Sequence, residues 1–174
     1  GAWTAPLAHT TPEPITLHRA LAEAVSHRVT HAAMEASSHG LDQRRLDGVT
    51  LAAAGFTNIT QDHLDYHPSF DDYFDAKAGL FARVLSEDGT AVINIDAARG
   101  IDMLAIAKAR GCATMTVGRE SGDLHLGNVQ IDATGQTVCF KRAGEQYVSR
   151  LRLIGDFQAE NIMLAAGLVI ACGA

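Results

Sequence analysis

Short apolar runs alternate with helical patterns along the first two thirds of the chain. The runs at 29–34, 51–56, 91–95 and 113–117 predict strands. Segments whose apolar residues recur every three to four positions predict helices at 15–27, 69–85 and 101–109. Strands and helices in this order are typical of a parallel sheet covered by helices, and strand 51–56 is expected to lie at its centre.

The pattern changes after Gly118. Residues 124–131, 137–142 and 146–153 alternate apolar with polar side chains, and short turns containing Gly135 and Gly144 separate them. Such strands predict an antiparallel meander that forms a small second sheet. A final apolar helix is expected from Gly155 through Ile170.

The expected fold class is therefore α/β, with a mostly parallel sheet flanked by helices and a small antiparallel meander. Its βαβ part is expected over residues 1–118, the meander over 119–154 and the final helix over 155–174.

Polar side chains follow the strand 51–56. Four of them could bind a metal ion, namely Asp62, His63, Asp65 and His67. Open α/β sheets place their ligand sites beyond the carboxyl ends of strands. Carboxylate oxygen and imidazole nitrogen suit a divalent cation or a metal-bound phosphate. The alternative is a loop whose Asp and His residues only cap the next helix.

Lys77 lies in the apolar stripe of the predicted helix 69–85. It is in step with four apolar side chains, Phe70, Phe74, Phe81 and Val84. An ammonium buried without a partner costs several kcal/mol, so its presence there requires an explanation. Lys77 could extend its amine to solvent, or form an ion pair with Asp62 or Asp65. It could also be a reactive lysine with a lowered pKa that faces the metal-binding loop.

Two further segments combine hydroxyl and charged groups. Glu35 and Ser37 follow the predicted strand 29–34, and Gln43 and Arg45 come soon after them, an arrangement that suits a metal-bound phosphate or an anionic substrate. A helix-capping cluster is the alternative reading. The step His9-Thr10-Thr11-Pro12 offers two hydroxyls beside a rigid turn, or simply the start of a helix.

Composition narrows the function classes. The 174 residues carry a formal net charge of −6, and no basic stripe is present, which argues against nucleic acid or an anionic membrane as partner. The three cysteines are far apart, a reduced cytosolic pattern. No apolar run is long enough to insert into a membrane. The chain begins at Gly1 instead of Met, and its last helical pattern stops at Ala174 without a clear cap, so we expect a fragment of a longer protein. No G-x-x-x-x-G-K-[ST] sequence occurs, so a phosphate-binding loop of that type is not expected in this chain.

Four motifs together resemble the Mur ligases. They are His9-Thr10-Thr11-Pro12, the segment Met34–Leu41, the segment Phe56–His67, and Tyr73 through Lys77 to Phe81. The chain is most similar to the branch that adds the third amino acid of the peptidoglycan stem. Folylpolyglutamate synthases share the fold and the lysine, but lack this combination.

The resemblance implies a central ATP-binding domain that lacks its first strand and its phosphate-binding loop. Its partners would be the N- and C-terminal domains of the same polypeptide, and the protein would be cytoplasmic. The resemblance further implies an ATP- and Mg²⁺-dependent ligase that forms an amide bond through an acyl phosphate. This enzyme would add meso-diaminopimelate, or L-lysine, to UDP-N-acetylmuramoyl-L-Ala-D-Glu.

The resemblance also implies roles for individual residues. Glu35, His63 and a carbamylated Lys77 would bind magnesium and support catalysis. Five residues would hold the muramoyl-peptide substrate: Thr10, Thr11, Ser37, Gln43 and Arg45. Asn161 matches the second asparagine of the family's Asn-x-x-Asn motif and would contact adenine. Gln158 stands at the position of the first asparagine.

Two alternatives come from other function classes. One is a small metal-dependent hydrolase that uses Asp62, His63, Asp65 and His67. The other is a ligand-binding module without catalytic activity.

Overall fold

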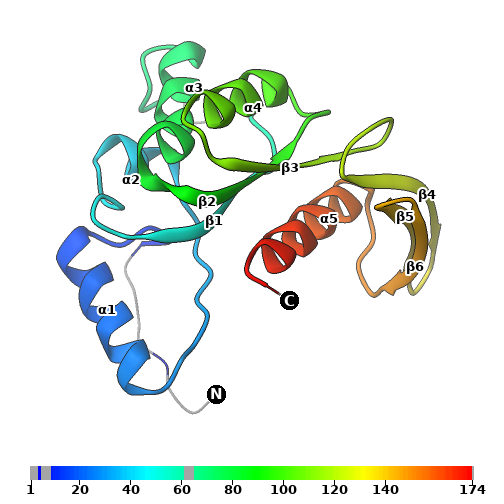
Figure 1. The fold of residues 1–174 in the computed structure, drawn as a ribbon, viewed down its shortest axis with the longest axis horizontal. Coiled ribbons are helices and arrows are strands. Elements are labelled where there is room, and N and C mark those ends of the chain that lie inside the picture. The colour runs from blue at the N-terminus through cyan, green and yellow to red at the C-terminus, as the bar shows by residue number, and fades with distance from the viewer. Residues whose placement is uncertain (1–3, 5–8, 61–64, 174) are drawn as a thin grey trace. The chain divides into compact units, whose positions relative to one another are not determined.

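The computed structural model describes residues 4, 9–60 and 65–173. The chain forms two compact units (Figure 1). The helical unit comprises residues 1–50 and 63–84, and the sheet unit comprises residues 51–62 and 85–174. Each unit is described by itself.

The sheet unit contains one six-stranded sheet, in which the strands lie in their sequence order. The strands are β1 (Leu51–Phe56), β2 (Leu85–Asn94), β3 (Ala113–Gly118), β4 (Leu124–Asp132), β5 (Gly135–Arg142) and β6 (Glu145–Leu151). Its helices are α4 (Gly100–Ala109) and α5 (Asp156–Ala171). The predicted α/β class, with a sheet flanked by helices, is confirmed.

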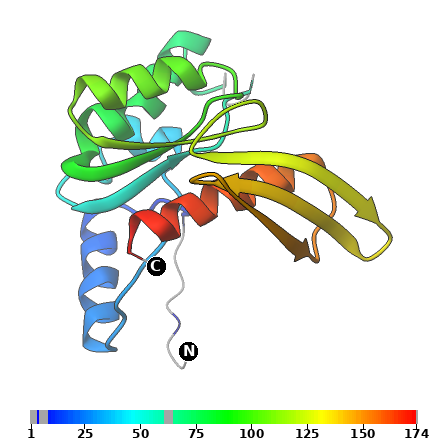
Figure 2. The ribbon, with the colours of Figure 1, turned by 45° about the vertical axis from the view of Figure 1, so that its right-hand side comes forward.

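Strands β1, β2 and β3 pair in parallel, and α4 connects β2 to β3. Figures 1 and 2 show α4 on one face of these strands and α5 on the other. The last four residues of β2, Ala91–Asn94, are all buried. Because successive side chains of a strand point to opposite faces, this burial requires cover on both sides of the sheet.

The meander is present, but the expected second sheet is wrong. Strand β4 pairs in parallel with β3 through two residue pairs, Val117 with Leu124 and Gly118 with His125. Strands β4, β5 and β6 then continue antiparallel. The free edge of β3 thus supplies hydrogen-bonding groups that β4 uses, and this joins the meander to the parallel strands. The central position expected for β1 is also wrong, because β1 lies at one edge of the sheet.

The core of the sheet unit forms where α5 packs on the sheet. Its buried members are Val92, Val117, Leu124, Leu126, Val138, Ala159, Met163 and Leu164. A Cβ on Gly167 of α5 would lie 2.6 Å from Cγ1 of Val92, and one on Gly55 of β1 would lie 2.8 Å from Cδ2 of Leu164. Glycine at these two positions therefore permits the close approach of helix and sheet.

The helical unit contains α1 (Pro14–Ser26), α2 (Ser38–Asp42) and α3 (Phe70–Gly79), followed by a π-helical turn (Leu80–Val84). Ser69 caps α3 as predicted, since its Oγ accepts a hydrogen bond from the backbone N–H of Asp72. The α-helical part ends earlier than the predicted 69–85, at Gly79. Phe74 and Phe81 are buried, which confirms that the stripe containing Lys77 faces the interior.

The predicted strand 29–34 does not form. Val29 and Met34 are 42% and 37% exposed, and the segment has no regular secondary structure. A strand requires a neighbour for its backbone N–H and C=O groups, and within the described residues no other strand pairs with this segment.

Candidate functional site

Among the described residues of the helical unit, Thr11 is the most deeply buried polar residue, with no exposed surface. Its Oγ1 donates a hydrogen bond of 2.8 Å to the backbone C=O of Glu35 and accepts one of 2.9 Å from the backbone N–H of Ser37. The C=O of Thr11 accepts a third bond, of 2.9 Å, from Nη1 of Arg45. Thr11 therefore links three other predicted site residues, Glu35, Ser37 and Arg45.

Ser37 begins α2 as its N-cap. Its Oγ accepts a hydrogen bond from the backbone N–H of Gly40 at 3.1 Å. A Cβ on Gly40 would lie 2.4 Å from Cγ2 of Thr11, so no larger residue fits there without movement. The capping interaction considered as an alternative is therefore present, in the same turn as the predicted substrate hydroxyl.

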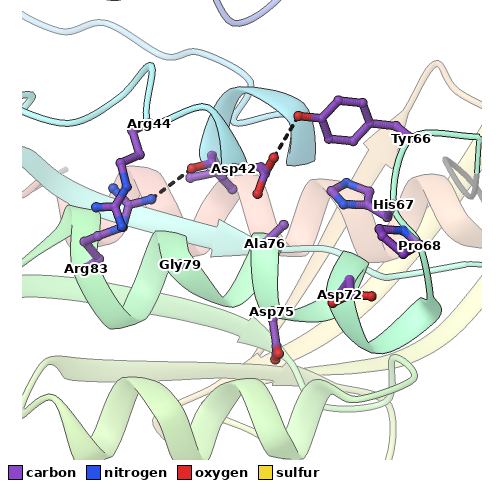
Figure 3. Close-up of a pocket in the computed structure, with 11 residues that line it drawn as sticks. Asp42, Arg44, Tyr66, His67, Pro68, Asp72, Asp75, Ala76, Gly79 and Arg83 are labelled. Atoms are coloured by element: carbon purple, nitrogen blue, oxygen red, sulfur yellow. Dashed lines mark hydrogen bonds between the residues drawn. The ribbon is translucent and has the colours of Figure 1, made fainter.

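A directed series of hydrogen bonds extends from Arg45. Its Nε and Nη2 donate to Oε1 of Gln43 at 3.0 and 2.6 Å, and Nε2 of Gln43 donates to the Tyr66 hydroxyl at 3.2 Å. The Tyr66 hydroxyl in turn donates to Oδ2 of Asp42 at 2.7 Å (Figure 3). Arginine can only donate and an ionised carboxylate can only accept, so the direction of every bond in the series is fixed.

Tyr66 was not identified from the sequence as a site residue. It was visible only as one position of the motif that ends at His67, and nothing local showed that its hydroxyl would reach α2. Its ring also packs on His39, with the ring centroids 3.9 Å apart. Tyr66 thus connects the segment after residue 64 with the predicted substrate-binding residues.

Lys77 is half-buried on α3. Its Nζ lies 5.3 Å from the centroid of the Tyr73 ring, within the range of a cation–π interaction. Burial lowers the pKa of Lys77, and the negative charge of Glu35 opposes part of that shift. The helical unit therefore brings Lys77 within electrostatic reach of Glu35, two residues that are 42 positions apart in the sequence.

His67 is 3% exposed and belongs to a stack of rings. Its ring stacks on Tyr73 at 5.2 Å and meets Tyr66 edge-on at 4.8 Å. Its imidazole thus packs in the interior of the unit.

Asp62 and His63 lie outside the described residues. Within the described part, no three His, Cys, Asp or Glu side chains are grouped as a metal site would require, so the hydrolase reading gains no support.

A cavity of about 510 Å³ lies beside this network (Figure 3). Arg44 and Arg83 are at one end and Tyr66 and His67 at the other. Its lining is Leu41, Asp42, Arg44, Tyr66, His67, Pro68, Asp72, Asp75, Ala76, Gly79 and Arg83. Arg83 fixes the wall, because it donates to the C=O of Leu41 at 2.9 Å and forms an ion pair with Asp47.

The remaining predicted residues are placed as follows. Thr10 is exposed beside the buried Thr11. Asn161 is half-buried on α5 of the sheet unit, next to Glu160, whose Oε1 accepts a bond of 2.9 Å from Nε of Arg119. Glu35 is exposed at its side chain.

The donor chemistry of the helical unit fits magnesium in part. Glu35 supplies a carboxylate, the hard oxygen ligand that Mg²⁺ prefers. The amine of Lys77 is not such a ligand, but a carbamate on it would add two oxygen atoms at a position that Glu35 already influences electrostatically. The lowered pKa favours the neutral amine that carbamylation requires.

No helix in the described part of the chain is long and apolar enough to cross a membrane.

Comparisons with known proteins agree with the motifs. The Mur ligase middle domain matches residues 2–169. A UDP-N-acetylmuramoyl-L-alanyl-D-glutamate–2,6-diaminopimelate ligase from Bradyrhizobium diazoefficiens is 46% identical over 169 residues, which cover 94% of this chain and 35% of that protein. The ligase of the same name from Brucella melitensis biotype 1 is 47% identical over 164 residues, covering 94% and 34%. The chain thus spans about a third of the length of these relatives.

Solved structures give the same result. A structure of a UDP-N-acetylmuramoyl-L-alanyl-D-glutamate–2,6-diaminopimelate ligase matches with a TM-score of 0.85 at 29% identity, over 93% of this chain and 34% of that one. MurF from Acinetobacter baumannii matches with a TM-score of 0.64 at 21% identity over 71% of this chain and 26% of that one, a likeness of fold alone. The chain belongs to the Mur ligase middle-domain family.

Proposed function

We propose that the chain is the middle part of an ATP-dependent ligase that joins 2,6-diaminopimelate to UDP-N-acetylmuramoyl-L-alanyl-D-glutamate. The relatives at 46% and 47% identity carry the name of that activity, which favours diaminopimelate over L-lysine as the added amino acid. The observation that carries the proposal is that the half-buried amine of Lys77 lies within electrostatic reach of Glu35 in one compact unit. We call the complete ligase the parent polypeptide, and place it in the cytoplasm, where ATP is available.

The proposed reaction has two steps. The terminal carboxylate of the dipeptide substrate attacks the γ-phosphate of ATP to give an acyl phosphate and ADP. The amine of diaminopimelate then attacks the acyl carbon and phosphate leaves, which forms the amide bond. Both reactants of the first step are anions, and at about 4 Å two like charges repel by several kcal/mol at an effective dielectric constant of about 20.

Ser37, Gln43 and Arg45 would orient the muramoyl-peptide substrate, with Thr10 beside them. Arg45 uses three N–H groups within the network described above, to Gln43 and to the C=O of Thr11. A guanidinium has five such donors, so two are left for an anionic group of the substrate. Because these three hydrogen bonds already hold the guanidinium in place, Arg45 would bind that group without first losing conformational freedom.

Lys77 would act as a carbamate. The neutral amine attacks carbon dioxide, a nitrogen–carbon bond forms, and the nitrogen loses a proton to solvent. Burial lowers the pKa of Lys77 and so increases the fraction of amine able to react. Glu35, the carbamate on Lys77 and His63 would together hold magnesium, which supplies positive charge to offset the repulsion between the two reacting anions. Asn161 would contact the adenine ring of ATP.

The test is the substitution Lys77→Arg in the parent polypeptide, because arginine keeps the positive charge but cannot be carbamylated. We expect amide formation and phosphate release to fall by about a hundredfold or more, the size typical of losing one group that stabilises the transition state. In ¹³C NMR with labelled bicarbonate, the wild type should show a carbamate resonance that Lys77→Arg lacks.

Lys108→Arg is the matched control, since Lys108 is an exposed lysine on α4. It should keep both the activity and the carbamate resonance. A wild-type polypeptide that makes no amide product from these substrates would contradict the proposed function. An active wild type with an equally active Lys77→Arg variant would contradict the role of Lys77 alone.

A further inference from the structure

We propose that Arg119 is a positioning residue of the adenine site, which holds the start of α5 in place through Glu160 without touching the nucleotide. The inference rests on the proposed function, because that function gives Asn161 the contact with adenine. It adds a residue that none of the four sequence motifs contains.

The backbone of Arg119 is fixed at the carboxyl ends of two parallel strands. Arg119 follows β3 directly, and Asp96 lies two residues beyond β2. The N–H of Arg119 donates to Oδ2 of Asp96 at 2.5 Å, and its C=O accepts a bond of 2.7 Å from Nε2 of His125 on β4. Both backbone polar groups of Arg119 are therefore paired, at the edge where open α/β sheets bind their ligands.

The side chain of Arg119 connects this edge to α5. Its Nε donates to Oε1 of Glu160 at 2.9 Å, across 41 positions of sequence. The two side chains are 36% and 32% exposed, so water screens the pair only in part. A charge-assisted hydrogen bond under these conditions is stronger than one between neutral groups. Arg119 thus joins β2, β3, β4 and α5.

The start of α5 has little else to fix it. Gly155 is its N-cap and has no side chain to accept a bond from the first turn, which is how most helix starts are stabilised. Phe157 is 61% exposed, so its ring adds little packing. Ala159 is buried, but contributes only a methyl group. The ion pair to Glu160 therefore supplies the restraint that a capping side chain would otherwise give.

Asn161 depends on the same restraint. It follows Glu160 directly, in the second turn of α5. Successive residues of a helix are 100° apart around its axis, so a rotation or fraying of this end moves both side chains together. A contact group that is loosely held binds its ligand more weakly. Removing the ion pair should weaken adenine nucleotide binding and leave the muramoyl-peptide site of the helical unit unaffected.

The experiment compares Arg119→Met, Glu160→Met and the double variant in the parent polypeptide. Each single substitution should raise the Kd for ADP, measured by calorimetry, and the KM for ATP about tenfold, which corresponds to about 1.4 kcal/mol. The KM for the muramoyl dipeptide should stay within about twofold of the wild type. The double variant should bind ADP no more than about twofold more weakly than either single one, because both remove the same interaction.

Two further readouts separate positioning from a general loss of stability. Arg119→Lys keeps a positive charge that can pair with Glu160, and should restore ADP affinity to within about threefold of the wild type. Hydrogen–deuterium exchange of the Asn161 amide should become about threefold faster or more in both methionine variants. Arg150→Met is the matched control, because Arg150 also forms an ion pair, with Asp132 at 2.6 Å, and is 40% exposed. It should leave ADP affinity unchanged.

Three results would overturn the inference. The first is a wild type that binds no ADP, and the second is ADP affinity unchanged in both methionine variants. The third is a loss in Arg119→Met that Glu160→Met does not share, which would show that Arg119 touches the nucleotide itself. A wild type that binds ADP but forms no amide bond would remove the proposed function alone, since the calorimetry would still decide the role of Arg119.

Discussion

Gln136 provides a quantitative test of the core of the sheet unit. It lies on β5 two residues before Val138, so both side chains point to the face covered by α5. Its side chain is fully buried, and neither Nε2 nor Oε1 has a hydrogen-bond partner among the described residues. Methionine has a similar length and shape, and needs no hydrogen bond. We therefore predict that Gln136→Met stabilises the unit.

The magnitude follows from the two unpaired atoms. Each buried polar group without a partner costs about 1–3 kcal/mol, and part of this is regained only if the unit relaxes. We expect a gain of about 2 kcal/mol in the free energy of unfolding, or about 4–8 °C in Tm for a chain of this length. Urea denaturation followed by far-ultraviolet circular dichroism should show a higher midpoint with an unchanged m-value.

Gln130→Met is the matched control, because Gln130 is an exposed glutamine on the neighbouring strand β4. It should change the free energy of unfolding by no more than about 0.5 kcal/mol. An equal gain in both variants would point to the unfolded state instead of the core. A loss of stability in Gln136→Met would show that the buried amide has a partner, and would refute the reasoning.

Two further predictions concern the site and the packing of helices. Tyr66→Phe removes the hydroxyl that accepts from Gln43, so the KM for the muramoyl dipeptide should rise about threefold to tenfold with kcat little changed, and an unchanged KM in steady-state assays would contradict the role of the network. Gly167→Ala places a Cβ 2.6 Å from Cγ1 of Val92 and should lower the free energy of unfolding by about 1–3 kcal/mol. Gly79→Ala, whose Cβ would lie 3.5 Å from the nearest side-chain atom, should instead raise it by about 0.5–1 kcal/mol. Thermal denaturation that gives the two glycine variants the same sign would contradict the packing argument.

Local pattern alone predicted much of the fold. The helical period located α1, α3 and α4, and the period of two located the strands of the meander. Ser69 was identified as a cap, and Lys77 as a lysine in an apolar stripe. These features depend on residues within one or two turns of each other, which the sequence displays directly.

Partners distant in sequence decided the rest. Whether β1 is central or at an edge, and whether β4 joins β3, depends on which strands offer free hydrogen-bonding groups. For the same reason the apolar run at 29–34 remained unpaired despite its composition.

The candidate site also depends partly on local sequence and partly on contacts between distant residues. The sequence motifs selected Thr11, Glu35, Ser37, Gln43, Arg45 and Lys77, but assigned each a role by resemblance. Folding showed that the Thr11 hydroxyl is buried and used within the chain, and that the Tyr66 hydroxyl completes a network with α2. The sequence by itself determined which chemical groups are available and which local elements carry them. Only the tertiary structure decided which of them are already paired, because burial and hydrogen bonding between distant residues exist only once the chain has folded.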